Sequence, residues 1–185
     1  MSKQILVGGV PVGGGAPVTI QSMCNTKTDD VEATVAQILQ LEEAGCEIVR
    51  VAIPDQAAAD AVGAIKERIH IPLVADIHFN YRYALRCAEQ GIDAIRINPG
   101  NIGGEEKVKA VAQACAARHI PIRIGVNGGS LEKNLRAKYG GVTAEALVES
   151  ALGHAALLEK HGFYDICFSV KSSDVPTTMA AYRLP

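Results

Sequence analysis

The pattern that decides the fold is Gly45-Cys-Glu-Ile-Val-Arg50-Val51, which returns as Gly91-Ile-Asp-Ala-Ile-Arg96-Ile97. A second pair alternates with it along the chain: His70-Ile-Pro-Leu-Val-Ala-Asp76 and His119-Ile-Pro-Ile-Arg123-Ile-Gly125. Each copy contains a short β-branched or aliphatic run, typical of a strand, with a charged residue near its end. Because a charge is costly in a core unless it has a partner, the repeat predicts both a fold and a site.

Six strands are predicted, with helical stretches between them. The strands are expected at Val18–Met23, Ile48–Ile53, Leu73–Ile77, Ala94–Ile97, Ile122–Val126 and Ile166–Val170. The helices have polar residues suited to cap or open them, namely Asp29 or Asp30, Asp55, Asn80, Glu105 with Glu106, and Thr143. Three glycines, Gly45, Gly91 and Gly162, lie where a helix is expected to end in a left-handed residue before the next strand.

Strands that alternate with helices indicate an α/β fold with a parallel sheet. A doubly wound sheet and a TIM barrel both fit, but polar residues at six successive strand ends favour the barrel, whose strand ends all meet at one mouth. A closed barrel has eight strands, so we expect residues 1–185 to form a single TIM-barrel domain, truncated after about six βα units within the sixth helix. Ile5–Val12 is expected to form a short β-hairpin ahead of it, with Gly8 and Gly9 at the turn.

Composition excludes several classes of protein. The chain has 185 residues, 48% of them hydrophobic, and a formal net charge of −2, which is ordinary for a globular domain and argues against non-specific nucleic-acid binding. No apolar run is long enough to span a membrane, and the first residues lack the apolar segment of a secretory signal. The five cysteines are widely spaced, without a Cys-x-x-Cys pair, so we expect a reduced cytoplasmic protein with no zinc site or disulfide framework.

The period of two in a strand determines which polar residues share a face. On successive strands the alternation groups Asp76 with His78, Arg96 with Asn98, Arg123 with Gly125 and Asn127, and Ser169 with Lys171. The repeat aligns Arg50 with Arg96. The opposite parity is apolar and would pack on the helices, so the polar set is expected to point into the mouth of the barrel.

Three arginines and a lysine at one mouth would repel each other unless an anion lies between them. Guanidinium groups match phosphate oxygens with paired hydrogen bonds, so a phosphate or diphosphate is the simplest ligand. The polyhydroxylated part of the same ligand would then be bound by Asn98, Asn127, Asp76 and His78. A single arginine at a strand end is more often in an ion pair with a neighbouring carboxylate. Asp76 and His78 could also be a metal pair, but no third ligand follows a nearby strand, so no metal site is predicted.

At these residues the chain resembles the N-terminal domain of the 4-hydroxy-3-methylbut-2-enyl diphosphate synthase family. The similarity covers nearly the whole chain. Its motifs are Val18-Thr-Ile-Gln-Ser-Met23, Asp30-Val-Glu-Ala-Thr34, Val74-Ala-Asp-Ile-His-Phe79, Arg96-Ile-Asn-Pro-Gly-Asn-Ile-Gly103, Pro121-Ile-Arg-Ile-Gly-Val-Asn127, Gly129-Ser-Leu-Glu-Lys133 and Ser169-Val-Lys171.

The resemblance implies an oxidoreductase of non-mevalonate isoprenoid biosynthesis. Such an enzyme opens the ring of 2-C-methyl-D-erythritol 2,4-cyclodiphosphate by two-electron reduction, giving 4-hydroxy-3-methylbut-2-enyl diphosphate. By resemblance, the diphosphate is held by Arg50, Arg96, Arg123 and Lys171. The carbon chain and hydroxyls are then contacted by Asp76, His78, Asn98 and Asn127.

The same resemblance implies parts that this sequence lacks. Family members carry a C-terminal domain with a four-iron four-sulfur cluster, reduced by flavodoxin or ferredoxin, and that domain caps the barrel of the partner in a homodimer. No cluster ligand is recognised in this chain, so we expect it to bind no cofactor, to supply the substrate-binding barrel and to be inactive alone. Two alternatives are another phosphate-binding barrel enzyme, such as a pterin-dependent synthase, and a non-catalytic fragment.

Overall fold

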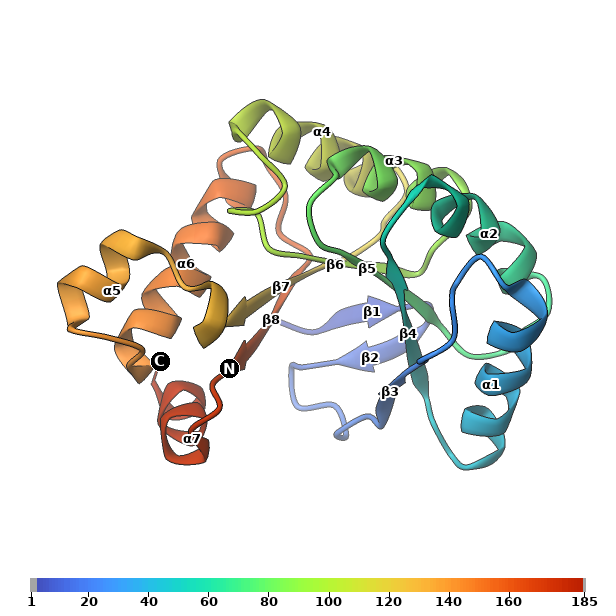
Figure 1. Cartoon of the computed structure of the whole chain (residues 1–185), viewed down its shortest axis with the longest axis horizontal. Coiled ribbons are helices and arrows are strands. Elements are labelled where there is room, and N and C mark those ends of the chain that lie inside the picture. Colours follow the sequence, from blue (N-terminus) through green and yellow to red (C-terminus); the bar gives the residue numbers. More distant parts are fainter. Residues whose placement is uncertain (1–2, 185) are drawn as a thin grey trace.

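The computed structural model describes residues 3–184 and shows one curled parallel sheet with helices on its convex side (Figure 1). The strands lie in the order in which they occur: β3 (Gln21–Met23), β4 (Ile48–Ile53), β5 (Leu73–Ile77), β6 (Ala94–Ile97), β7 (Ile122–Asn127) and β8 (Ile166–Lys171). This consecutive order is that of a TIM barrel, whereas a doubly wound sheet reverses direction at a switch point. The predicted fold class, part of a TIM barrel with six strands, is confirmed.

Five of the helices in residues 3–184, α1 to α4 and α6, begin where the sequence predicts. The helices are α1 (Val31–Glu43), α2 (Gln56–Lys66), α3 (Tyr81–Glu89), α4 (Glu105–Ala116), α5 (Lys133–Tyr139), α6 (Ala144–Glu159) and α7 (Val175–Arg183). The side chains of Asp30, Asp55, Asn80 and Thr143 each accept a hydrogen bond from a backbone N–H of the first helical turn, which an N-cap requires. The three glycines predicted to end helices all have positive φ, between 74° and 90°.

Two parts of the fold differ from the sequence prediction. A 3₁₀ turn (Gly128–Ser130) and helix α5 lie between β7 and α6, and neither was predicted; buried Leu131 and Leu135 attach this insertion to the core. Strand β3 starts at Gln21 rather than Val18, whose exposed fraction is 98%. The neighbouring strand begins only at Ile48, so the paired residues of the two strands start at Gln21, and Ile20 contributes its carbonyl oxygen as an acceptor for Ile48 N.

The inward face of the sheet is closed at its amino-terminal end by the predicted hairpin. Strands β1 (Ile5–Val7) and β2 (Val10–Val12) pair antiparallel within the curve of the sheet (Figure 1). Ile5 and Val7 pack in one cluster with inward residues of the strands, Ile48, Val74 and Ala94. Gly8 has a φ of 52°, and a Cβ there would lie 2.8 Å from Pro72, so both conformation and space require glycine.

The outward face of the sheet forms the main core with the helices. Val49, Val51, Ile95, Ile122 and Ile124 are fully buried there, which confirms the predicted parity of the strands. The inward positions beyond those that pack on the hairpin are left to the polar set. No helix within residues 3–184 is long and apolar enough to cross a membrane.

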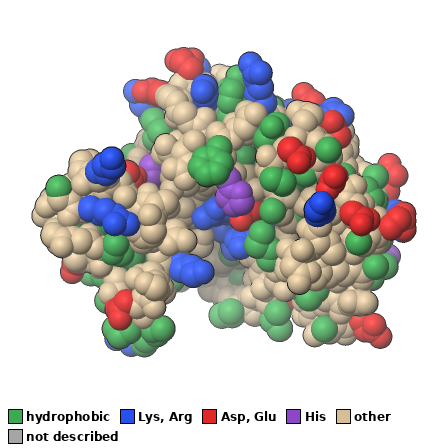
Figure 2. Space-filling model, in the orientation of Figure 1, with side chains coloured by type: hydrophobic (Ala, Val, Ile, Leu, Met, Phe, Trp, Pro, Cys, Tyr) green, Lys and Arg blue, Asp and Glu red, His purple; other side chains and the backbone are tan. Residues whose placement is uncertain are grey.

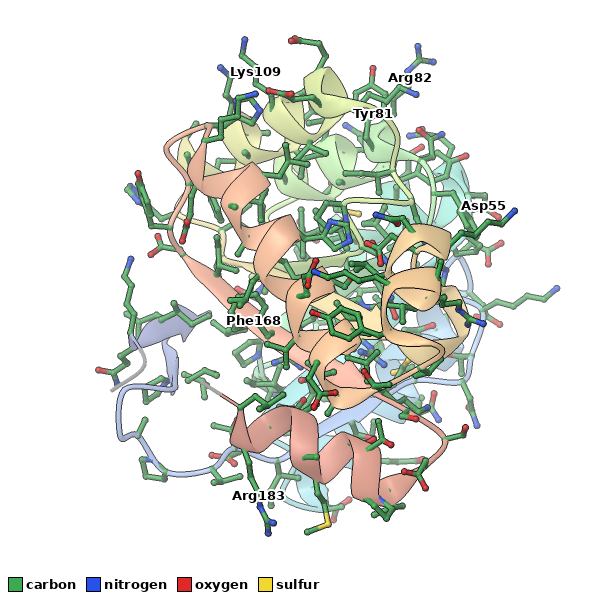
Figure 3. All side chains as sticks on the ribbon, turned by 90° about the vertical axis from the view of Figure 1, so that its left-hand side faces the viewer. Asp55, Tyr81, Arg82, Lys109, Phe168 and Arg183 are labelled. Atoms are coloured by element: carbon green, nitrogen blue, oxygen red, sulfur yellow. The ribbon has the colours of Figure 1, made fainter. Side chains whose placement is uncertain are left out.

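The sheet remains open on both sides. Within the described part of the chain, β3 and β8 each have a strand neighbour on one side alone. An apolar groove of about 830 Å³ runs beside β8 between α6 and α7, lined among others by Leu152, Phe168 and Tyr182. Figure 3 shows Phe168 beside α6 in this region, and its exposed fraction is 40%.

Candidate functional site

The inward polar residues form a layer across neighbouring strands above the hairpin. The register places Asp76 of β5 opposite Arg96 of β6, and Arg96 opposite Arg123 of β7. Arg50 lies on β4, opposite Val74. Asp76, Arg96 and Arg123 therefore lie at one level of the inward face, and Arg50, one inward position earlier on its strand, reaches Asp76 with its side chain.

Asp76 is the centre of this layer. Its side chain is 5% exposed, and its two oxygens lie 2.9 Å from Arg96 Nη1 and 3.5 Å from Arg50 Nε. His78 Nε2 lies 3.7 Å from the same carboxylate. The ion pair anticipated as the ordinary alternative is therefore present, and it holds two of the arginines in place. Figure 2 shows Lys and Arg side chains with a histidine in the hollow at the middle of this face.

The cations outnumber the carboxylate that holds them. Burial lowers the pKa of the Arg50 guanidinium; Asp76 raises it, whereas Arg96 and Arg123 lower it. Both neighbouring arginines therefore repel Arg50 across the mouth. A guanidinium stays protonated under all ordinary conditions, so this mouth carries an excess of positive charge that one aspartate does not neutralise.

Gly125 of β7 provides the space for Arg96. A Cβ at this position would lie 2.1 Å from Arg96 Nε and 2.3 Å from Nη2, closer than real atoms approach. Arg96 Nη2 also lies 3.4 Å from the Gly125 carbonyl oxygen. The absence of a side chain at Gly125 therefore decides where the guanidinium lies.

Two contacts of the site were missed in the sequence prediction, although both residues lie in a quoted motif. Gln21 Oε1 accepts a hydrogen bond from Arg123 Nη1 at 2.6 Å, and Met23 Sδ lies 3.2 Å from Arg50 Nη2. Both come from β3, where alternate positions share a face. The period of two would have placed both side chains on the inward face had the strand been treated like its neighbours, although it does not say which arginine each contacts.

The remaining predicted residues lie at the ends of the strands. Asn98 is buried and its Oδ1 accepts from Gly100 N at 3.0 Å, while Asn127 Oδ1 accepts from Gly129 N at 3.1 Å. Lys171 is exposed and lies opposite Asn127 in the register of β7 and β8. The oxygen of each asparagine is thus occupied by its own loop, which leaves both amide N–H donors for other partners.

Four buried side-chain nitrogens have no hydrogen-bond partner within the described residues: Arg96 Nε, Gln21 Nε2, His154 Nε2 and His161 Nε2. Buried polar atoms are nearly always paired, so each unpaired atom requires an explanation. Arg96 Nε and Gln21 Nε2 both belong to the layer of inward polar residues that contains Arg50, Arg96 and Arg123, here called the cation layer. An oxyanion in the mouth would supply the missing acceptors and balance the excess charge.

The residues present do not fit an iron–sulfur cluster. No group of three or more His, Cys, Asp or Glu side chains within residues 3–184 is arranged to hold a metal ion. Four of the five cysteines are buried, and burial raises the pKa of Cys87 and of Cys115 to about 12 each. Thiolate is the form that ligates iron, and these sites disfavour it.

Fold and site together define a TIM-type α/β domain with a cationic mouth. The chain belongs to the GcpE family, since the family model of the GcpE TIM-barrel domain matches residues 2–185. It is 61% identical over 182 residues to the 4-hydroxy-3-methylbut-2-en-1-yl diphosphate synthase (flavodoxin) of Lysinibacillus sphaericus, covering 98% of this chain and 49% of that protein. The synthase of the same name from Ruminiclostridium cellulolyticum is 58% identical, over 99% of this chain and 52% of that protein. The chain thus spans about half the length of these relatives.

Solved structures of similar shape include dihydropteroate synthases. The enzyme of Xanthomonas albilineans in complex with 7,8-dihydropteroate superposes with a TM-score of 0.64 at 15% identity, covering 90% of this chain and 64% of that one. The enzyme of Vibrio fischeri gives 0.66 at 12% identity, covering 90% and 66%. At such identity the likeness supports the barrel fold alone.

Proposed function

We propose that this chain is the substrate-binding barrel of a 4-hydroxy-3-methylbut-2-enyl diphosphate synthase and binds 2-C-methyl-D-erythritol 2,4-cyclodiphosphate in its mouth. The observation that carries the proposal is the cation layer, in which Asp76 pairs with Arg50 and Arg96, while Arg123 beside them is hydrogen-bonded to the neutral Gln21. Membership of the GcpE family supports the choice of ligand among anions. A cyclic diphosphate carries both the charge that this layer needs and hydroxyls for the neutral donors beside it.

The proposal gives each predicted residue a role. The phosphate oxygens bind to Arg50, Arg96, Arg123 and Lys171. The amide groups of Asn98 and Asn127 donate to the hydroxyls or bridging oxygens of the ligand. Asp76 orients two arginines and, with His78, contacts the carbon chain. No proton or electron transfer is assigned to any of these side chains.

Reductive ring opening requires two electrons and two protons, and releases one water. In the proposal the electrons come from a four-iron four-sulfur cluster held outside the described residues and reduced by flavodoxin or ferredoxin, in a cytoplasmic homodimer. The contribution of this chain is then to bind and orient the diphosphate. We expect no reductase activity from it without those parts.

Isothermal calorimetry on the chain tests the proposal directly. We expect binding of the cyclic diphosphate and none of neutral 2-C-methyl-erythritol. Replacing Arg96 with alanine removes a charge-assisted hydrogen bond and is expected to cost about 2 kcal/mol of binding free energy, or roughly thirtyfold in affinity. The matched control is Arg183→Ala, which removes the same charge from an exposed position on α7 (Figure 3). Equal affinity for the two ligands would refute the proposal.

A further inference from the structure

A polar cluster behind the mouth has no part in the function proposed above. It consists of Glu132, Ser150 and His154, where Glu132 is the N-cap of α5 and the other two lie on α6. Ser150 is 3% exposed and its hydroxyl donates to both Glu132 oxygens, at 2.9 and 3.0 Å. His154 Nε2 lies 2.8 Å from Glu132 Oε1, with its side chain 12% exposed.

The imidazole of His154 contacts a second loop as well. A Cβ on Gly100 would lie 3.1 Å from His154 Cε1 and 3.3 Å from Asn98 Oδ1, so ring, glycine and asparagine are packed together. The Gly100 N–H is the donor to that same Asn98 oxygen. On its far side the loop is attached to the core by Ile102, which is 1% exposed. His154 therefore lies directly behind the loop that orients Asn98.

Glu132 is connected to the other asparagine, Asn127, by the short stretch of chain between them. Asn127 ends β7, the 3₁₀ turn follows, and Glu132, five residues after Asn127, is the N-cap of α5. The turn is closed by Asn127 Oδ1 accepting from Gly129 N and by Arg136 Nη2 donating to the Gly128 carbonyl. Glu132 accepts the Arg136 N–H at its own carbonyl oxygen, 2.9 Å away. In Figure 1, α5 lies against α6, which brings the two loops to one helix.

We propose that Glu132 and His154 are positioning residues that fix the Asn98 and Asn127 loops relative to each other, and with them the neutral half of the ligand site. An apolar contact between α5 and α6 would bury surface but would not fix the orientation of the two helices, whereas hydrogen bonds and ion pairs depend on direction and favour one orientation. Buried polar groups cost free energy unless they are paired. Ser150 is paired with Glu132 by hydrogen bonds, whereas His154 Nε2 lies within ion-pair distance of Glu132 but makes no hydrogen bond of good geometry within the described residues, so the charge of Glu132 is what acts on the ring. The role in binding rests on the function proposed above, but the fixing of the loops does not.

The charge state of His154 gives a spectroscopic signature. Burial lowers the pKa of the imidazole, and Glu132 raises it. Within the described residues the charged group that contacts this ring is Glu132, and Gly100 and Asn98 on the facing loop are neutral. The ring is thus mostly neutral at pH 7, and we expect its NMR titration to fall below the ordinary histidine value. Glu132→Gln removes the charge that raises this pKa, so the midpoint should fall further.

His161 offers a matched control. Its side chain is also 12% exposed and also faces a glutamate, with Nε2 3.5 Å from Glu105 Oε1, just beyond the end of α6. Within residues 3–184 its ion pair leads to α4 and not to either asparagine loop. We expect His154→Ala to shift the amide NMR signals of Gly100 and Gly129 in the ligand-free chain, and His161→Ala to leave both in place. His154→Gln, which keeps a polar donor facing Glu132, should restore them.

Binding provides the second measurement, with two probes. We expect His154→Ala to weaken the cyclic diphosphate about tenfold, the scale of one lost hydrogen bond, and to leave inorganic diphosphate unchanged because the cation layer is intact. General destabilisation would weaken both probes. Unchanged Gly100 and Gly129 signals in His154→Ala would overturn the inference. If the wild-type chain binds neither probe, the proposed function fails, and the amide signals still decide whether these residues fix the loops.

Discussion

Replacing Gly125 with alanine tests the geometry of the cation layer with a single methyl group. The new Cβ would lie 2.1 Å from Arg96 Nε, 2.3 Å from Nη2 and 2.5 Å from Cζ. All three atoms belong to the flexible end of one side chain, so the backbone need not move. The guanidinium has to leave its place instead, and with it the 2.9 Å contact to Asp76.

The size of the effect follows from the contact that is lost. A hydrogen bond between charged groups contributes about 1.5–3 kcal/mol, and we expect Gly125→Ala to lower the free energy of unfolding by that amount. The same displacement removes one anion donor from the mouth. Affinity for the cyclic diphosphate should therefore fall by roughly ten- to a hundredfold.

Urea unfolding and calorimetry on the same preparations measure both effects. The control is Gly153→Ala in the middle of α6, where a Cβ meets nothing within 4 Å. That change should be neutral or stabilise the chain by about 0.5–1 kcal/mol, because alanine favours helix over glycine. In an Arg96→Ala background, Gly125→Ala should have little effect, since the side chain that it displaces is absent.

A clear result would refute this reasoning. If Gly125→Ala keeps the stability and the affinity of Gly153→Ala, Arg96 does not occupy the space beside Gly125. If Gly125→Ala and Arg96→Ala act additively, the methyl group acts through something other than the guanidinium.

Three further predictions follow from burial and charge. Asp76→Asn leaves the arginines without their carboxylate, and we expect a loss of about 3–5 kcal/mol in urea unfolding, with tighter binding of inorganic phosphate; an unchanged midpoint would contradict the ion-pair geometry. Cys87 and Cys115, whose pKa values burial raises to about 12, should stay protonated and resist iodoacetamide at pH 8, while half-buried Cys167 reacts; equal rates in the native chain and in urea would argue against burial. The open edges of β3 and β8 and the groove beside α7 should make the chain self-associate, and a monodisperse monomer in light scattering with a cooperative melt would show that six strands suffice.

The framework of the domain could be predicted because its signals are local. Capping by Asp55 and Thr143 and the left-handed Gly91 depend on residues within one turn, and the structure shows all three. Strand parity is equally local, and it correctly separated Arg96 from Ile95. The two-state choice at each strand residue, inward or outward, needs no knowledge of the partner strand.

What could not be predicted depends on contacts distant in sequence. Arg123 and Gln21 are 102 residues apart, and no pattern within either strand states that they meet. Gly125 appears in the sequence as a small residue between Ile124 and Val126, and only the position of Arg96 gives it a function. Helix α5 was missed because it is short and follows a glycine-rich turn, where periodicity has little to act on. The roles of the eight site residues in binding stay predictions until a ligand is measured.

The consecutive strand order has a consequence for how the chain is made. Every strand from β4 to β8 pairs with the one synthesised before it, so contact order across the sheet is low, and the domain can grow unit by unit as it leaves the ribosome. The hairpin is the exception. Ile5 and Val7 are synthesised before the six strands, but they pack against Val74 and Ala94, so they have to wait until β6 has formed. The hairpin therefore remains without its packing partners until about half of residues 3–184 have been made.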